Sequence, residues 1–99
     1  MNMQAMLMQA QKIQRELTKA RNELASKEFV VEKGGAIKVT VLGNKQVKSV
    51  SIDENALKED KEMVQDMIVL AINEAQEQIK AAEEEINLRL TGRKEGIGM

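Results

Sequence analysis

The sequence lacks several residue types on which the chemistry of protein sites commonly depends. Its 99 residues include no Cys, His, Pro, Trp or Tyr, and Phe29 is the single aromatic residue. A chain without Cys or His forms no disulfide and lacks the usual ligands of zinc, haem iron and iron–sulfur clusters. It also lacks the base of a Ser-His-Asp or Cys-His arrangement. We therefore expect a protein that is not an enzyme and holds no cofactor.

A base-stacking surface and a membrane span are also missing. One aromatic residue cannot form the stacking platform that single-strand binders use. No apolar run approaches the roughly 18 residues of a membrane helix, and residues 1–8 have no positive region ahead of an apolar core. We expect a cytoplasmic protein that binds neither a membrane nor a small-molecule substrate.

The chain length fits one small domain, residues 1–99. A hydrophobic share of 42% permits a core. A domain of this size nevertheless buries only about 60–65% of the surface that its unfolded chain exposes. We therefore expect oligomerisation.

Near the N-terminus, apolar residues recur with a heptad spacing. Steps of three and four residues alternate over three heptads, which is typical of a coiled coil. Strong helix formers fill the positions between, so the pattern predicts a first helix over about residues 3–26. The residues of this apolar stripe are Met3, Met6, Ala10, Ile13, Leu17, Ala20 and Leu24.

From Phe29 onward the apolar pattern has a period of two, which indicates strands at about residues 29–33, 37–42 and 47–52. The pairs Gly34-Gly35 and Gly43-Asn44 separate the strands, and both supply residues that accept positive φ in tight turns. We expect a three-stranded antiparallel meander with one apolar face and one face of Lys, Ser and Thr.

A long second helix follows the predicted strands. Its apolar residues recur every 3.7 residues or so, which predicts a helix over about residues 60–91. Asp60 is a plausible N-cap and Gly92 a stop, while Glu54–Leu57 fits a short turn and residues 92–99 form a tail. The resulting fold class is α+β, in the order helix, three strands, helix.

The predicted helices are too long for a compact globule. At 1.5 Å per residue they measure about 36 and 45 Å, whereas a globule of this size is about 34 Å across. At least one helix end must project, and a projecting apolar stripe needs a partner. That partner is the end of the second helix, a second subunit, or both.

The charges are segregated along the chain. Residues 1–27 carry five Lys or Arg against two Asp or Glu, and residues 28–59 carry five of each sign. Residues 60–91 carry three basic against eight acidic residues, and residues 92–99 carry two against one. The total of −1 argues against a uniformly basic nucleic-acid binder but allows a local basic patch. The first helix is basic and the second is acidic.

Lys12, Arg15 and Lys19 are three and four residues apart, so we expect them to form a stripe roughly opposite the apolar stripe. A solvated outer face is the ordinary explanation of such a pattern. The functional interpretation is that a projecting basic helix presents point charges to a DNA backbone. Arg93 and Lys94, just past the second helix, could add to this surface.

Four segments, in this order and spacing, carry a resemblance that covers nearly the whole chain. They are Met8–Gln14, Gly34–Val41, Val47–Asp53 and Asp66–Ala75. With them the sequence resembles the YbaB/EbfC family of bacterial nucleoid-associated proteins.

The resemblance implies a tweezer-like homodimer of α-β-α protomers that binds double-stranded DNA with limited sequence preference. It also implies a place in the nucleoid and an influence on nucleoid organisation and gene expression. Family members contact DNA through their protruding helices. Carried onto this chain, that points to Lys12, Arg15 and Lys19, and more weakly to Arg21, Lys27, Arg89, Arg93 and Lys94.

Two alternatives belong to other classes of protein. A helix–strands–helix chain with coiled-coil stripes also resembles a prefoldin-type subunit, which holds protein partners at its helix tips. Such arms need heptads well beyond three, whereas the first helix stops at about Ser26. An enzyme is the third alternative, but it would have to rely on carboxylates, lysines and isolated hydroxyls, with no evident apolar pocket around a carboxylate pair.

Overall fold

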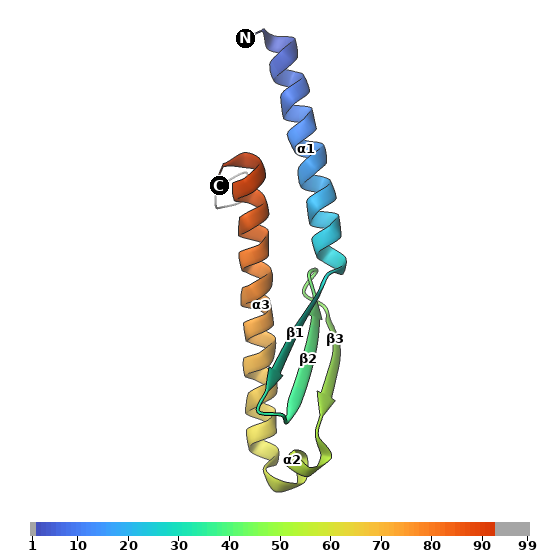
Figure 1. Ribbon diagram of the computed structural model, residues 1–99, viewed down its shortest axis with the longest axis vertical. Coiled ribbons are helices and arrows are strands. Elements are labelled where there is room, and N and C mark those ends of the chain that lie inside the picture. Colours follow the sequence, from blue (N-terminus) through green and yellow to red (C-terminus); the bar gives the residue numbers. More distant parts are fainter. Residues whose placement is uncertain (1, 93–99) are drawn as a thin grey trace.

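The computed structural model describes residues 2–92 (Figure 1). The molecule is elongated, with extents of 68 × 20 × 17 Å. The expected α+β order of helix, antiparallel sheet and long helix is confirmed, with a further short helix between sheet and long helix. The elements are α1 (Met3–Ser26), β1 (Glu28–Lys33), β2 (Ile37–Leu42), β3 (Val47–Ile52), α2 (Glu54–Glu59) and α3 (Lys61–Thr91).

Side-chain caps begin both long helices. The Asn2 side chain accepts a hydrogen bond from the amide of Ala5 at 2.7 Å, and the Asp60 side chain accepts one from Met63 at 3.0 Å. These bonds satisfy amides that have no partner within the helix. Gly92 ends α3 in the left-handed conformation, at φ 75°.

The segment expected to be a short turn at Glu54–Leu57 is instead a helix, α2, that continues to Glu59. Asp53 explains the difference, because its side chain accepts a hydrogen bond from the amide of Ala56 at 3.0 Å and so caps this helix. At Asp60 the chain leaves the helical conformation, at φ −153°, before α3 begins.

The sheet has the order β1-β2-β3, and both strand pairs are antiparallel. Val39 in the central strand lies opposite Val31 on one side and Val50 on the other. A bulge between Thr40 and Val41 shifts the register toward β3. The expected meander is therefore present, with aligned valines on one face.

The two turns use glycine for different reasons. Gly34 and Gly35 adopt φ of 57° and 65°, as expected of a tight turn. Gly43-Asn44 does separate β2 from β3, but the positive φ of this turn belongs to Lys45, at 76°, and not to either of these two residues as expected. Gly43 is required by close packing instead, because a Cβ there would lie 1.7 Å from the carbonyl oxygen of Leu24.

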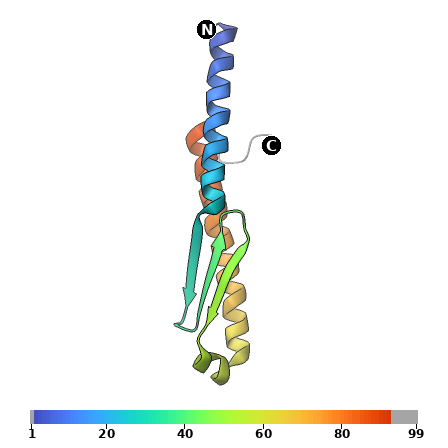
Figure 2. The ribbon, with the colours of Figure 1, turned by 90° about the vertical axis from the view of Figure 1, so that its right-hand side faces the viewer.

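The core lies between α3 and the part of the sheet formed by β1 and β2 (Figures 1 and 2). Val39 and Val41 of β2 are fully buried, as are Val64 and Ala71 of α3. In contrast, all six residues of β3 are exposed. Helix α3 thus covers two of the three strands.

Beyond the sheet, α1 and α3 lie side by side and run in opposite directions (Figure 1). Leu17 and Leu24 of the apolar stripe are buried there. Met3 and Met6 of the same stripe are exposed, since α1 continues past the end of α3. Helix α3 is therefore the partner of only half of the apolar stripe.

Candidate nucleic-acid interface

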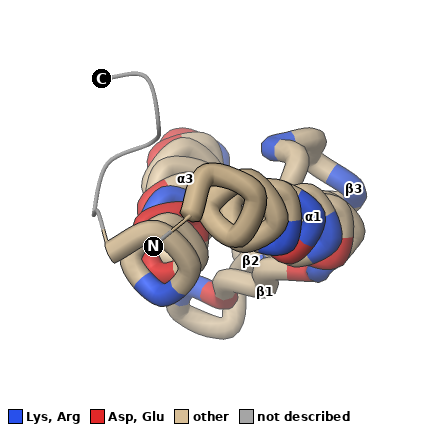
Figure 3. The backbone as a smooth tube through the Cα atoms, turned by 90° about the horizontal axis from the view of Figure 1, so that it is seen from above, with Lys and Arg blue, Asp and Glu red and all other residues tan. Residues whose placement is uncertain are grey.

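Three basic residues, which we name the basic stripe, lie on the side of α1 that faces away from α3. Lys12, Arg15 and Lys19 are all exposed. With 3.6 residues per turn they fall within about 60° of one another around the helix, opposite the buried Leu17. Figure 3, a view along the molecule, shows the Lys and Arg positions as blue bands on α1.

The charges of the basic stripe are available to a ligand. Within residues 2–92, none of its three side chains takes part in an ion pair, and α1 carries only Glu16 and Glu23 as acids. The stripe spans about 10 Å of helix, at 1.5 Å per residue. Four successive phosphates of one DNA strand span a similar length, with about 3.4 Å of axis between neighbours. The stripe can therefore contact phosphates as a row of point charges.

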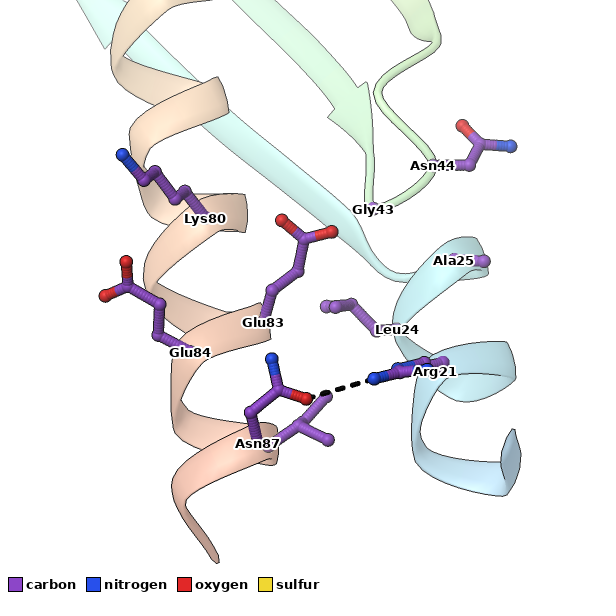
Figure 4. A pocket seen from close by; sticks show the side chains of 10 residues that line it. Arg21, Leu24, Ala25, Gly43, Asn44, Lys80, Glu83, Glu84 and Asn87 are labelled. Carbon is purple, nitrogen blue, oxygen red and sulfur yellow. Dashed lines mark hydrogen bonds between the residues drawn. The ribbon is translucent and has the colours of Figure 1, made fainter. Parts of the chain in front are cut away.

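Arg21 differs from the basic stripe because it lies on the side of α1 that packs against α3. It follows Leu17 by four residues and precedes Leu24 by three. Its Nη2 donates a hydrogen bond to Oδ1 of Asn87, a buried residue, at 3.1 Å (Figure 4). Arg21 thus joins the two long helices.

A groove of about 620 Å³ lies beside Arg21, between α1, α3 and the β2–β3 turn (Figure 4). Lys80, Glu83 and Glu84 also line it, and Nζ of Lys45 is 3.9 Å from Glu83. Both cations and carboxylates line this groove. An anion entering it would meet both signs of charge, so the groove is not part of the basic stripe.

Lys27 and Arg89 lie together on the other flank of the α1–α3 contact, where they line a groove with Glu23 and Glu85. Nζ of Lys27 is also 5.4 Å from the centre of the Phe29 ring, within range of a cation–π interaction. Both cations therefore share a groove with carboxylates, and Lys27 also has an aromatic neighbour. The last two sequence candidates, Arg93 and Lys94, lie outside the described residues.

The carboxyl of Glu28 has a shifted pKa. Nζ of Lys48 donates a hydrogen bond to Glu28 at 2.7 Å, and this bond together with the lysine charge holds the pKa of Glu28 below its ordinary value. The pair spans the sheet from β3 to β1, across β2. Its role is to join the two edge strands, at a distance from the basic stripe.

Other kinds of site have no support in the part of the chain that the structure describes. Residues 2–92 contain no group of three or more Asp or Glu side chains placed to hold a metal ion. Among these residues, no helix is both long enough and apolar enough to span a membrane.

The sequence profile of the YbaB/EbfC DNA-binding family matches residues 1–94. The chain belongs to this family. The resemblance recognised in the sequence is therefore confirmed, and membership of the YbaB/EbfC family favours a nucleoid-associated protein over the prefoldin-like alternative.

Two relatives illustrate the similarity within the YbaB/EbfC family. A nucleoid-associated protein of Francisella philomiragia is 33% identical over 99 residues, which cover 99% of this chain and 89% of that protein. A nucleoid-associated protein of Metamycoplasma arthritidis is 46% identical over 76 residues, which cover 76% of this chain and 79% of that protein. The similarity to the Francisella protein includes the basic helix, the sheet and the acidic helix.

The structure also shows exposed apolar surface that the sequence pattern did not reveal. Val47, Val50 and Ile52 of β3 are exposed, although Val50 and Ile52 follow the same alternation as the buried residues in β2. The signal for this surface is the position of β3 at the sheet edge, away from α3. Such a surface is a candidate for contact with another chain.

Proposed function

We propose that this protein binds double-stranded DNA as a homodimer, mainly through phosphate contacts, and thereby influences nucleoid organisation and gene expression in the bacterial cytoplasm. The basic stripe is the observation that carries the proposal. Lys12, Arg15 and Lys19 are exposed, unpaired within residues 2–92, and aligned on a projecting helix. Phosphate contacts of this kind fix a protein on DNA without reading its sequence. Membership of a DNA-binding family supports the same ligand.

The test is a gel-shift titration of two unrelated duplexes of equal length. We expect Lys12→Ala, Arg15→Ala and Lys19→Ala together to weaken binding to both duplexes by a similar factor. The matched control removes three exposed lysines from the opposite end of the molecule, with Lys38→Ala, Lys58→Ala and Lys61→Ala.

This control changes the net charge by the same amount, so it separates local contacts from overall electrostatics. Equal losses for the two triple variants, or a loss on one duplex only, would remove the basic stripe from the proposal. If the wild-type protein binds neither duplex even at low salt, the stripe is only a solvated face.

The edge strand β3 supports the homodimer. It combines exposed Val47, Val50 and Ile52 with backbone groups that have no neighbouring strand on one side within residues 2–92. Exposed edge strands tend to pair with another chain. A second copy that presents its own β3 would cover both edges symmetrically. The basic stripe lies on α1, beyond the sheet, so this contact leaves it accessible.

The dimer surface has its own test. We expect Val47→Lys with Val50→Lys to lower the mass in light scattering from twice the 11.1 kDa of one chain to that of a single chain. The control is Val30→Lys, because Val30 is as exposed (46%) as Val47 (45%) but lies on the opposite face of the sheet. If the double variant keeps the wild-type mass, the copies meet elsewhere.

A further inference from the structure

The first three turns of α1, which we name the tip (residues 3–13), extend past the end of α3 (Figure 1). Met3, Met6, Leu7 and Ala10 line a shallow apolar groove on the tip. All four residues are exposed. These four residues therefore form an apolar helix surface that no other part of residues 2–92 covers, while Ile13 at the base of the tip is half-buried against the core.

The tip differs in charge from the rest of α1. Residues 2–11 contain Met, Leu, Ala, Gln and Asn but no charged residue, and Lys12 is the first cation. A surface that binds phosphates relies on Lys and Arg. Residues 3–11 of the tip therefore lack the cations on which the contact proposed for the basic stripe relies, and their apolar face suits a protein surface.

The tip also continues a helix-packing face already in use. Met6 and Ala10 lie on the same face of α1 as Leu17, which packs against α3 farther along. Helix α3 ends at Thr91 and does not reach them. A face of this kind suits another helix, which would pack on α1 beyond the point where α3 ends.

We propose that the tip packs against the tip of a second copy of this chain. An uncharged surface that meets its own copy leaves no charge buried and unpaired, which is the main cost of a mismatched interface. The contact is about 15 Å long, at 1.5 Å per residue. A contact of this length buries less surface than the usual stable interface, which buries about 800 Å² per partner. The association is therefore weak and concentration-dependent.

This contact goes beyond the proposed DNA binding and does not depend on it. The basic stripe lies on the opposite side of α1, so copies joined at their tips keep Lys12, Arg15 and Lys19 exposed. Two DNA-binding surfaces would then be held in one assembly. Binding of several copies to one duplex would raise their local concentration and favour the tip contact.

The test uses the absence of cysteine in the natural chain, so that a single introduced thiol reports one position. Met6→Cys places the thiol on the apolar face of the tip, and Met8→Cys places it on the opposite face. The two positions are similarly exposed, at 56% and 64%, so they have comparable access to oxidant. We expect disulfide-linked dimers to form several times faster with Met6→Cys, and equal rates would overturn the proposal.

Sedimentation velocity over a range of protein concentrations, without DNA, gives a second readout. We expect Met6→Glu to abolish the highest association step, because it places a carboxylate on each side of the contact, whereas Met8→Glu leaves this step unchanged. Circular dichroism checks that both variants keep their helices. If Met6→Glu associates as the wild type does, the tip is not the contact. Because no DNA is present, failure of DNA binding leaves this result unaffected.

Discussion

Arg15 and Arg21 lie on the same helix but have different surroundings. Arg15 is exposed, with no ion-pair partner within residues 2–92, whereas Arg21 donates a hydrogen bond to Asn87 of α3. Lys27 has a third environment, above the ring of Phe29. The value of a cation for DNA binding therefore depends on its neighbours, and the net charge of α1 alone does not rank these residues.

Gly43 gives a prediction at the scale of one residue. A Cβ at this position would lie 1.7 Å from the carbonyl oxygen of Leu24, so Gly43→Ala must shift the β2–β3 turn or the end of α1. We expect this overpacking to lower the free energy of unfolding by about 2–4 kcal/mol, measured by urea denaturation. Gly35→Ala is the control, because within residues 2–92 no atom beyond the adjoining residues lies within 4 Å of its added Cβ. Its cost of about 1–2 kcal/mol comes only from the positive φ.

The pair of Lys48 and Glu28 gives a prediction about pH. The lysine lowers the pKa of Glu28, so the pair stabilises the fold at neutral pH and this contribution is lost as the pH falls through the lowered pKa. We expect Lys48→Met to return the pKa of Glu28 toward its ordinary value, measured by NMR titration of the side-chain carboxyl. Lys45→Met, which removes a lysine from the turn between β2 and β3, should leave the pKa of Glu28 unchanged. An equal rise in both variants would mean that overall charge controls this pKa.

At the scale of elements, the contact between α1 and α3 holds the basic helix on the sheet-bearing part of the molecule. Leu17 is fully buried in this contact, and Leu24 is buried near the sheet end. An isolated helix of this length is only marginally stable in water. Packing against α3 is therefore what keeps α1 ordered along half of its length.

Leu17→Ala tests this contact. We expect a loss of about 2–5 kcal/mol in the free energy of unfolding, since the change removes buried methyl groups and leaves a cavity. Met3→Ala is the control, because Met3 belongs to the same apolar stripe but is 78% exposed. Its effect should stay within about 0.5 kcal/mol. Thermal unfolding followed by circular dichroism measures both, and similar effects would mean that the tip is as well packed as the base of α1.

Most elements were predictable because periodicity and capping are local properties. The heptad of α1, the alternation in β2 and the Asp60 cap are each visible in a short window of sequence. The alternation in β3 has the same form, but its exposure depends on where α3 crosses the sheet. That crossing is set by packing over the whole chain, so a strand pattern cannot reveal it.

The basic stripe was predictable for the same local reason, since the spacing of Lys12, Arg15 and Lys19 fixes their common side of the helix. The position of Arg21 was also visible in the heptad, three residues before Leu24. Its partner Asn87 was not visible, because it lies 66 residues away on another helix. Long-range pairs of this kind require the relative placement of α1 and α3.

At the scale of the whole molecule, charge is separated along and across an elongated body. The basic stripe faces away from α3, and the acidic residues concentrate on α3 itself (Figure 3). Duplex DNA that approaches the outer side of α1 meets the three cations of the basic stripe, with Glu16 and Glu23 as the carboxylates of α1 beside them. A net charge of −1 is compatible with DNA binding when the charges are arranged in this way.

The dependence of DNA binding on salt follows from this arrangement. Each phosphate neutralised by the protein adds about 0.9 to the slope of log K against log salt concentration. We expect the triple variant of the basic stripe to reduce the slope by about 2.7 for each protomer in contact. Fluorescence anisotropy at several salt concentrations measures it. Glu16→Gln should strengthen binding, because it removes a carboxylate next to Arg15. An unchanged slope in the triple variant would mean that other cations hold the DNA.

The part of α1 that projects past α3 behaves as a stiff rod that is held at one end only. Helices bend gently, with radii of about 60–100 Å, so a 15 Å overhang deviates from a straight line by only about 1–2 Å. The tip therefore points where Leu17, Leu24 and Gly43 clamp the base of α1. A small rotation of α1 about its packed base would therefore displace the N-terminal end of the helix by a larger distance than it displaces the base. The direction of the tip is thus set by residues that lie outside the tip, where α1 packs against the rest of the molecule.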